Sequence, residues 1–328
     1  MAEESGLAGR TAVVTGAGGF IGAALCRRLA RAGAEVSGLD ANPAAQQRIR
    51  EAGAEPRLAD VTDAGAVALA LDGADLVLHA AAIVSDAGTM ETHVKVNVGG
   101  TVNVLAAAES AGVDRVLHVS SVVVYGYDDP GVQDENANLR TCGIPYIDTK
   151  SASDRLARRQ GAIVVRPGDV YGPGSVPWSI RPAEMAKAGR LAVPGEGDGV
   201  MLPVYVDDLV DGILVALSQG EAGEAYTAWK DDEPVTFEEY LNRYSGMAGT
   251  RPARHLPRPL LRGVGVAMET ASRLTGRPPE MTRHAVTLID RRGSVSAGRL
   301  RSLGWEPRVG LDEGLARTEQ WLRAEGFL

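Results

Sequence analysis

The sequence predicts an α/β fold in which helices cover both faces of a doubly wound parallel sheet. Two observations favour it: short apolar runs recur through the first half of the chain, and helix-forming segments separate them. Strands buried on both faces of a parallel sheet are apolar almost throughout, and several of these runs are. The expected strands cover residues 11–15, 35–39, 56–60, 75–79, 115–120 and 162–166.

Helical patterns fill the intervals, notably residues 21–33, 93–112 and the segment that follows Tyr146. Strand, helix and strand at this spacing indicate right-handed crossover units. Beyond residue 167 the chain is rich in glycine and proline, and 204–220 has the pattern of a strand that runs into a helix. We therefore expect a doubly wound domain and a smaller, interleaved C-terminal substrate-binding domain. The first covers 1–170 and is completed by about 204–226, and the second is formed mainly by 171–203 and 227–328.

Composition excludes several classes of protein. The formal net charge of −8 argues against binding to nucleic acid or to an anionic membrane surface, which attract clustered positive charge. No apolar run of about 18 residues is present, and the N-terminus lacks a hydrophobic signal core. Two cysteines, Cys26 and Cys142, cannot form a disulfide framework, and the histidines show no paired metal spacing. We expect a cytoplasmic protein without a membrane span or a metal site.

A glycine-rich stretch follows the first expected strand directly. It reads TGAGGFIG over residues 15–22, with glycines at 16, 19 and 22, and with Phe20 and Ile21 at the start of the next helix. Such glycines permit a tight turn, the approach of backbone to a pyrophosphate, and close helix–strand packing. The helix N-terminus then offers N–H groups to the phosphates. A purely structural turn is the alternative, but the strand before and the helix after favour a dinucleotide site.

An acidic residue follows the glycine stretch at the spacing that such a site needs. Asp40 lies 18 residues after Gly22, at the end of the second expected strand, where a carboxylate accepts hydrogen bonds from a ribose diol. A 2′-phosphate would meet a repulsion on the order of 4 kcal/mol there, so NAD is preferred over NADP. A cap of the next helix is the alternative role. Asp60 and Val61, after the third strand, are further candidates for contact with the adenine, again with a cap as the alternative. The first domain is therefore predicted to be an NAD-binding Rossmann domain.

The stretch YIDTK brings a phenol and an ammonium to one face of a helix. Tyr146 and Lys150 are four residues apart, which is about one helical turn. A phenol with a pKa near 10 becomes a useful base at neutral pH when an ammonium at roughly 4 Å stabilises its anion. Upstream, HVSSVVVYG places Ser120 and Ser121 at the carboxyl end of a strand, where ligands bind in such sheets. Alone the pair can be ordinary helix surface, but with the glycine loop it predicts an acid–base centre for hydride transfer.

These motifs together resemble the extended short-chain dehydrogenases/reductases over nearly the whole chain. The resemblance is carried by TGAGGFIG (15–22), Asp40, Asp60-Val61, HAAA (79–82), NVGGT (97–101), SSVVVYG (120–126), YIDTK (146–150), RPGDVYGP (166–173) and VYVDDLVDGI (204–213). It implies that Ser121 is the catalytic hydroxyl, that Tyr146 is the acid–base and that Lys150 also contacts the nicotinamide ribose. Ser120 is then structural.

The resemblance also assigns residues around the cofactor. It implies that Ala80, Ala81 and Ala82 line the cofactor and that Pro167 and Val170 lie beside the nicotinamide. Asn97 matches a residue that supports the active site, although a buried asparagine bonded to backbone is an equal alternative. The resemblance further implies a homodimer formed through the helices near 93–110 and 146–160.

Two departures bear on the substrate. Nucleotide-sugar members of the family usually carry an asparagine before VYGP, where this chain has Asp169. They also commonly carry an arginine before the phenylalanine that precedes VYVDD, where this chain has the apolar residues 201–203. Both differences disfavour a diphosphate, unless Arg181 or Arg190 replaces the missing arginine. Asp207 and Asp208 are expected to cap the helix that follows.

The C-terminal third resembles the 3β-hydroxysteroid dehydrogenase and sterol dehydrogenase branch, through residues 255–290 and 300–322. There an apolar helix covers a hydrophobic substrate, and the candidates for this cover are Leu260, Leu261, Val264, Val266 and Met268. We therefore expect an NAD-dependent oxidoreductase that interconverts a secondary alcohol and a ketone on an apolar small molecule, sterol-like or a secondary metabolite. The alternatives are a nucleotide-sugar epimerase or dehydratase that retains NAD, and a cofactor-sensing regulatory protein.

Overall fold

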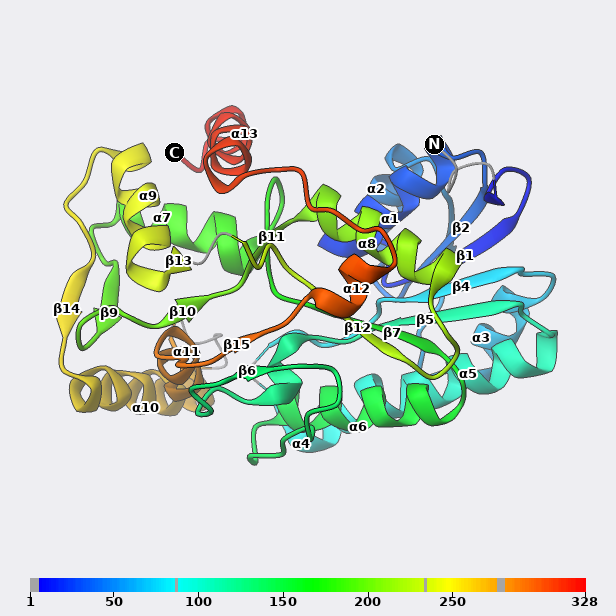
Figure 1. Ribbon diagram of the computed structural model, residues 1–328, viewed down its shortest axis with the longest axis horizontal. Coiled ribbons are helices and arrows are strands. Elements are labelled where there is room, and N and C mark those ends of the chain that lie inside the picture. The colour runs from blue at the N-terminus through cyan, green and yellow to red at the C-terminus, as the bar shows by residue number, and fades with distance from the viewer. Residues whose placement is uncertain (1–5, 86–87, 233–234, 276–280) are drawn as a thin grey trace.

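The centre of the molecule is a seven-stranded parallel sheet in the order β12-β7-β5-β4-β1-β2-β3 (Figure 1). The computed structural model describes residues 6–85, 88–232, 235–275 and 281–328. All six expected strands are present in the sheet, which confirms the predicted fold class. The strands are β1 (Thr11–Thr15), β2 (Glu35–Asp40), β3 (Glu55–Leu58), β4 (Leu76–His79), β5 (Arg115–Val119), β7 (Ile163–Pro167) and the additional β12 (Ala225–Ala228).

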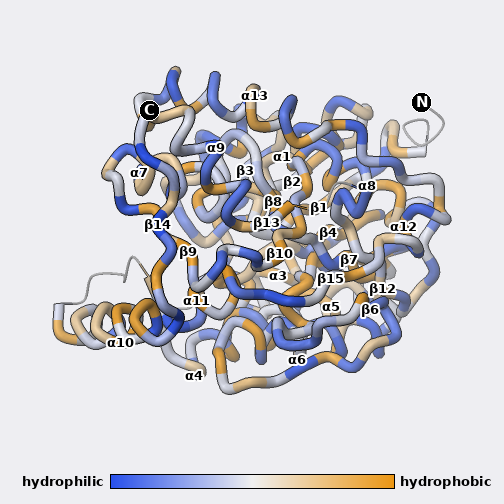
Figure 2. The backbone as a smooth tube through the Cα atoms, turned by 60° about the vertical axis from the view of Figure 1, so that its left-hand side comes forward, coloured by the Kyte–Doolittle hydropathy of each residue, from blue (hydrophilic) through white to orange (hydrophobic). Residues whose placement is uncertain are grey.

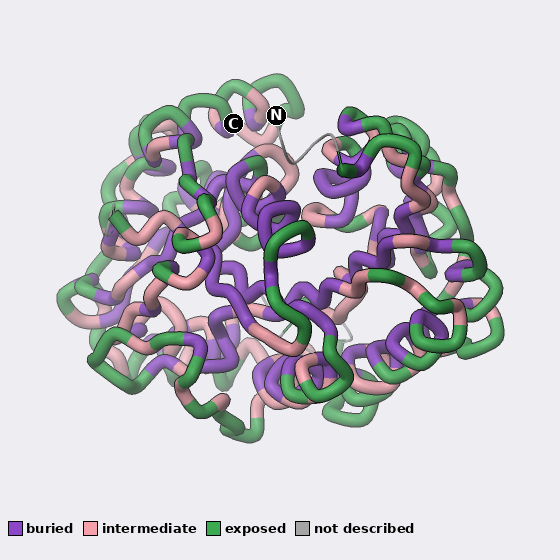
Figure 3. The backbone as a smooth tube through the Cα atoms, turned by 45° about the vertical axis from the view of Figure 1, so that its right-hand side comes forward, coloured by how far each residue is buried: buried purple, intermediate pink, exposed green. Residues whose placement is uncertain are grey.

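Helices cover both faces of this sheet (Figure 1). One face carries α1 (Phe20–Arg31), α2 (Gln46–Glu51) and α8 (Val206–Gln219), and the other carries α3 (Ala64–Leu71), α5 (Gly100–Ala111) and α6 (Pro145–Arg159). Successive residues of β1 therefore enter different cores: Val14 packs with residues of α1, whereas Val13 packs with residues of α3 and α5. Both are 1% exposed or less, and buried backbone fills the interior of the molecule (Figure 3).

The helix expected over 93–112 consists of three pieces. They are α4 (Met90–His93), the π-helix η3 (Val94–Gly99) and α5. The π-helical turn contains Asn97, which is buried and bonded to backbone of a neighbouring loop. A π-helical turn within a longer helix frequently marks a functional site, because it turns a side chain away from the regular helical direction.

The C-terminal part forms a second body of short strands and helices at the carboxyl edge of the sheet (Figure 1). Its strands pair in twos: β11 (Pro203–Tyr205) with β8 (Asp169–Tyr171), β14 (Arg254–Leu256) with β9 (Ala192–Pro194), β10 (Val200–Met201) with β13 (Val235–Thr236), and β15 (Ser294–Val295) with β6 (Val132–Gln133). Its helices are α7 (Arg181–Lys187), α9 (Phe237–Ala248), α10 (Arg258–Thr275), α11 (Arg283–Ile289) and α13 (Leu311–Ala324), whereas α12 (Gly298–Ser302) packs against β12 and α8. Within the residues described, no helix is both long and apolar enough to span a membrane.

Helix α10 carries the residues expected to cover an apolar substrate, and it projects from the body of the molecule (Figure 2). Leu261 is buried, whereas Leu260 and Val266 are 53% and 45% exposed. The last two side chains are therefore exposed on α10, and their contact with an apolar substrate stays a prediction. Residues 276–280 of the same resembling segment lie outside the described part of the chain.

The two aspartates at the start of α8 do not cap it. The helix begins at Val206, and its N-cap residue Tyr205 makes no side-chain capping bond. Asp208 is buried instead, and its carboxylate accepts the backbone N–H groups of Arg308 (3.0 Å) and Val309 (2.9 Å). Asp208 thus ties the C-terminal segment to the first domain, a contact across about a hundred residues of sequence that local capping patterns do not reveal.

Replacing Asp208 by alanine should destabilise the fold. The change leaves two backbone N–H groups without their acceptor, so the free energy of unfolding should fall by about 1–3 kcal/mol. The neighbouring Asp207 is exposed, and Asp207→Ala should change stability by about 0.5 kcal/mol or less. Urea denaturation of both variants measures this, and equal losses would contradict the role given to Asp208.

Candidate active site

The glycine loop joins β1 to α1 at the carboxyl edge of the sheet. Gly16 has a φ of +67°, and a Cβ there would lie 2.8 Å from Cα of Ala81. A Cβ on Gly22 would lie 2.1 Å from the carbonyl oxygen of Gly16, so this helix packs as close to the loop as backbone allows. The N-cap residue Gly19 has no side chain that could cap the helix, and the first turn of α1 contains no acidic residue. The helix N-terminus therefore suits a phosphate, as the sequence predicts.

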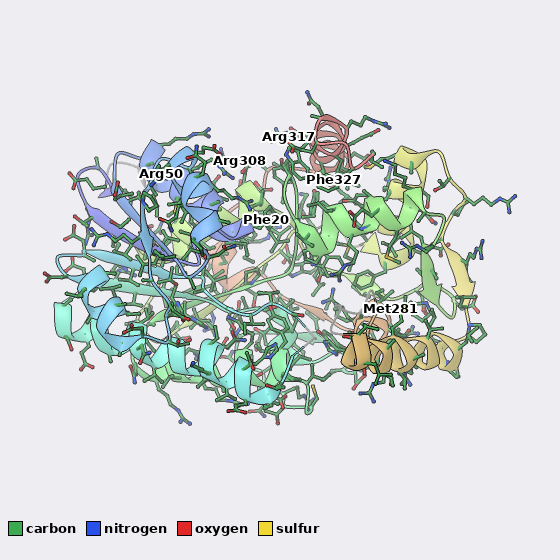
Figure 4. The ribbon with its side chains drawn as sticks, turned by 180° about the vertical axis from the view of Figure 1, so that it is seen from behind. Phe20, Arg50, Met281, Arg308, Arg317 and Phe327 are labelled. Carbon is green, nitrogen blue, oxygen red and sulfur yellow. The ribbon has the colours of Figure 1, made fainter. Side chains whose placement is uncertain are left out.

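Asp40 stands beside this loop at the end of β2. It is half-buried, and its carboxylate accepts the backbone N–H groups of Gly18 (3.0 Å) and Asn42 (2.9 Å). The carboxylate is thus fixed next to the glycine loop, where it fits the ribose diol of NAD. Phe20 lies at the border with the C-terminal part (Figure 4), and a Cβ on Gly174 would lie 3.6 Å from its ring.

The other residues expected near the cofactor differ in their surroundings. Ala80, Ala81 and Ala82 are half-buried and follow β4, next to the glycine loop, while Ile21 is half-buried within the first turn of α1. Pro167 and Val170 are buried in β7 and β8.

Asp60 is exposed and accepts the N–H of Thr62, while Val61 is buried against α5. The local turn therefore uses the Asp60 carboxylate, and contact between Asp60 and adenine stays a prediction.

Asn97 connects two of these segments. Its amide oxygen accepts the N–H of Ile83 (2.7 Å), and its amide nitrogen donates to the carbonyl of Ile83 and to the hydroxyl of Thr149 (3.0 Å). The Thr149 hydroxyl in turn lies within α6, one residue before Lys150. Asn97 thus bonds to backbone and also joins the cofactor-side loop to the helix that carries the predicted acid–base pair.

The two serines after β5 have different roles. Ser120 is buried and donates to the carboxylate of Asp154 at 2.6 Å. Asp154 also receives two bonds from the buried guanidinium of Arg166, at 2.8 and 2.9 Å. Ser121 is half-buried and accepts the N–H of Val123, and among the described residues no acceptor takes its hydroxyl hydrogen. Ser121 therefore remains able to donate to a substrate, whereas Ser120 is held in place.

Helix α6 presents Tyr146 and Lys150 beside these serines. Tyr146 is half-buried and packs with Val123 and Ile147. Lys150 is 3% exposed, and its ammonium donates to the carbonyl of Val119 at 2.7 Å. Burial lowers the pKa of Lys150 to about 8, although the Asp154 carboxylate opposes the shift. The lysine is thus anchored to the end of β5, two residues before Ser121.

A buried ion pair that the sequence analysis missed lies where the sheet meets the C-terminal part. Asp169 accepts the N–H of Leu202 (2.8 Å) and pairs with the guanidinium of Arg291; the two side chains are 6% and 4% exposed. The charge of Asp169 is therefore compensated, which corrects the expectation that this acid itself repels a diphosphate. Arg181 and Arg190 are both exposed. In the sequence this ion pair could have been suspected from Asp169 alone, because a carboxylate in a buried strand needs a cation to compensate its charge.

Three comparisons with known proteins agree with this geometry. The sequence profile of the NAD-dependent epimerase/dehydratase family matches residues 12–229. The chain belongs to this family. It is an NAD-dependent enzyme of the extended short-chain dehydrogenase/reductase type, and it resembles reductases and 3β-hydroxysteroid dehydrogenases.

Individual relatives fall on both sides of the substrate question. A 2-alkyl-3-oxoalkanoate reductase of Shewanella oneidensis is 28% identical, with 94% of this chain and 85% of the relative covered. A 3β-hydroxysteroid dehydrogenase/Δ5→4-isomerase of Mycobacterium tuberculosis is 29% identical, with 90% and 85% covered. A solved dTDP-glucose 4,6-dehydratase of Streptomyces venezuelae with NAD bound has a TM-score of 0.76 and 28% identity, with 96% and 97% covered.

The lowered pKa of Lys150 predicts how the stability of the fold depends on pH. Below about pH 8 the folded protein holds a charged lysine that the interior disfavours. Between about pH 8 and 10.5 the unfolded chain binds more protons than the folded one, so stability contributed through Lys150 rises with pH. Lys150→Met lacks this dependence. Its stability relative to the wild type should therefore fall as pH rises through that window.

Thermal or chemical denaturation at several pH values measures the difference. The matched control is Lys95→Met, because Lys95 is exposed. A constant difference between wild type and Lys150→Met from pH 7 to 10.5 would mean that Lys150 keeps an ordinary pKa in the fold.

Proposed function

We propose that the protein interconverts a secondary alcohol and a ketone on an apolar small molecule, with NAD as hydride carrier and Tyr146 as acid–base. The observation that carries the proposal is the placement of Lys150: its ammonium is buried and bonded to Val119, and the residue follows Tyr146 by one turn of α6. An ammonium in that position stabilises a tyrosinate. Ser121, with its hydroxyl hydrogen uncommitted among the described residues, follows two residues after Val119.

The residues divide the proton chemistry among them. Tyr146 takes the hydroxyl proton of the alcohol, or returns it to the oxygen of the ketone. Ser121 donates a hydrogen bond to the same oxygen while negative charge develops on it. The positive charge of Lys150 stabilises the anionic form of the Tyr146 phenol. Bound NAD supplies the hydride chemistry, and the glycine loop with Asp40 suits its pyrophosphate and ribose.

The side chains around Asp169 and around residues 201–202 support an apolar substrate. Arg291 is buried and already paired with Asp169, so a diphosphate would have to displace a carboxylate to reach it. Met201 and Leu202, where nucleotide-sugar members commonly place an arginine, are buried among apolar side chains. The names of the two relatives above, an oxoalkanoate reductase and a hydroxysteroid dehydrogenase, point to the same kind of substrate. Residues 171–203 and 227–328 are proposed to form most of its binding site, beside the NAD-binding part at 1–170.

A nucleotide-sugar dehydratase or epimerase is the second candidate. The similarity to the dTDP-glucose 4,6-dehydratase favours it, since that match covers nearly the whole of both chains. Such an enzyme regenerates its NAD in each turnover and so keeps it bound.

We also propose a homodimer, formed through the face of α4, η3, α5 and α6. Met90, Val94 and Val102 are exposed apolar residues along this helical layer, and α5 packs beside α6. A four-helix interface between two copies would bury them.

Replacing Tyr146 by phenylalanine tests the chemistry. The variant loses the proton carrier and keeps the ring, so turnover should fall by about 10²-fold or more while NAD binding is retained. The assay uses 3β-hydroxysteroids with NAD, and long-chain 3-oxo acids with NADH. The control is Tyr226→Phe, which removes a phenol bonded to the backbone of Glu221. Undiminished turnover by Tyr146→Phe would refute the proposed mechanism.

A further inference from the structure

A row of three buried polar side chains crosses the sheet beside the candidate active site. Thr15 of β1 lies opposite His79 of β4, and His79 lies opposite His118 of β5. Each is 1% exposed or less, and the centroids of the two imidazole rings are 5.2 Å apart. Polar groups buried in this way are costly unless hydrogen bonds satisfy them. No step of the proposed chemistry uses either histidine. Their role is therefore inferred from the hydrogen bonds that they make.

The bonds of His79 determine where its proton lies. The Thr101 hydroxyl donates its one hydrogen to the carbonyl of Asn97 (2.7 Å), so it must accept from Nε2–H of His79 (3.0 Å). Nδ1 then accepts from the hydroxyl of Thr15 (2.7 Å), whose oxygen accepts the N–H of Ala81 (3.2 Å). A neutral imidazole satisfies every bond in this chain. It joins Ala81, on the cofactor side, to the backbone of Asn97.

His118 repeats the arrangement one strand away. The Ser153 hydroxyl donates to the carbonyl of Lys150 (3.1 Å), so it accepts from Nε2–H of His118 (3.2 Å). Within the described residues Nδ1 of His118 has no hydrogen-bond partner. A proton on Nδ1 would therefore be an unpaired buried donor beside the Lys150 ammonium. The chain from His118 ends on the backbone of the lysine itself.

The electrostatic surroundings keep both imidazoles neutral. Burial first, and the charge of Lys150 second, lower the pKa of His79 to about 3 and hold the pKa of His118 well below its ordinary value. Neither ring gains a proton near neutral pH. Together with the hydrogen bonds that the neutral rings make, this favours a role as fixed hydrogen-bond donors.

We propose that His79 and His118 are positioning residues of the active site, each holding one backbone carbonyl through one hydroxyl. His79 holds Asn97 through Thr101, and His118 holds Lys150 through Ser153. A fixed carbonyl at Lys150 sets the direction in which its side chain leaves α6, and so the distance from its ammonium to Tyr146. The inference rests on the proposed function, in which that distance controls the ionisation of the phenol.

The first test follows the ionisation of Tyr146 directly and needs no substrate. Tyrosinate absorbance is recorded during a pH titration, and the same titration of Tyr146→Phe identifies the signal of Tyr146. His118→Leu should raise the titration midpoint of Tyr146 by about one pH unit, because the backbone of Lys150 loses its contact through Ser153 and only the bond to Val119 still positions the ammonium. His118→Gln, whose amide donates from the position of Nε2, should keep the midpoint near that of the wild type.

A double-mutant cycle tests the connection through Ser153. Ser153→Ala breaks the same chain at the next atom, so it should shift the midpoint as His118→Leu does. The double variant should shift it no further. Thermal denaturation of each variant shows that the fold is kept.

The outcomes separate the inference from the proposed function. A midpoint unchanged in His118→Leu, while Tyr146→Phe removes the signal, would overturn the role of His118. If the wild type and Tyr146→Phe show the same titration, the proposed state of Tyr146 is wrong, whatever the histidines do.

The second test concerns His79. Because its chain reaches Ala81, His79→Leu should raise the Kd for NAD by about tenfold, as measured by fluorescence titration. His118→Leu should raise that Kd much less. Equal effects of the two variants, or no effect of His79→Leu, would overturn the role of His79.

Discussion

The site depends on the burial of one ammonium. Lys150 is almost fully enclosed, and its ammonium donates a hydrogen bond to the carbonyl at the end of β5. A buried charge is tolerated only where neighbours compensate it. Asp154, four residues on in α6, lies close enough to raise the lysine pKa, yet its own charge is shared with Arg166 and Ser120. The end of β5, the start of α6 and the strand that carries Arg166 are therefore fixed relative to one another.

Much of the fold could be predicted because its signals are local. Strands buried on both faces must be apolar, and this identified six of the seven strands of the sheet. The seventh, β12, reads Ala-Tyr-Thr-Ala and is too short and mixed to be recognised alone; its pairing with β7 defines it. The interruption of the helix over 93–112 was missed because η3 depends on the bonds of Asn97 to Ile83 and Thr149, which are contacts between distant segments.

In the candidate site, too, the local motifs could be predicted and the contacts between distant segments could not. The glycine loop, Asp40 and the pair Tyr146 and Lys150 follow from spacing along single elements. The pairing of Asp169 with Arg291 joins residues 122 positions apart, so the sequence can indicate that Asp169 needs a cation but not which residue supplies it. That pair bears on the proposed substrate because it occupies the arginine that a diphosphate would seek. The proposed specificity thus rests on long-range contacts, whereas the proposed chemistry rests on local motifs.

The proposed dehydrogenase and the alternative epimerase or dehydratase differ in whether NAD is exchanged in each cycle or retained. The most direct measurement is to denature freshly purified protein after gel filtration and quantify the nicotinamide cofactor that it releases. The account predicts little retained NAD and readily reversible binding of added NAD. Near-stoichiometric NAD that survives gel filtration would contradict it, and would indicate the internal redox chemistry of an epimerase or dehydratase.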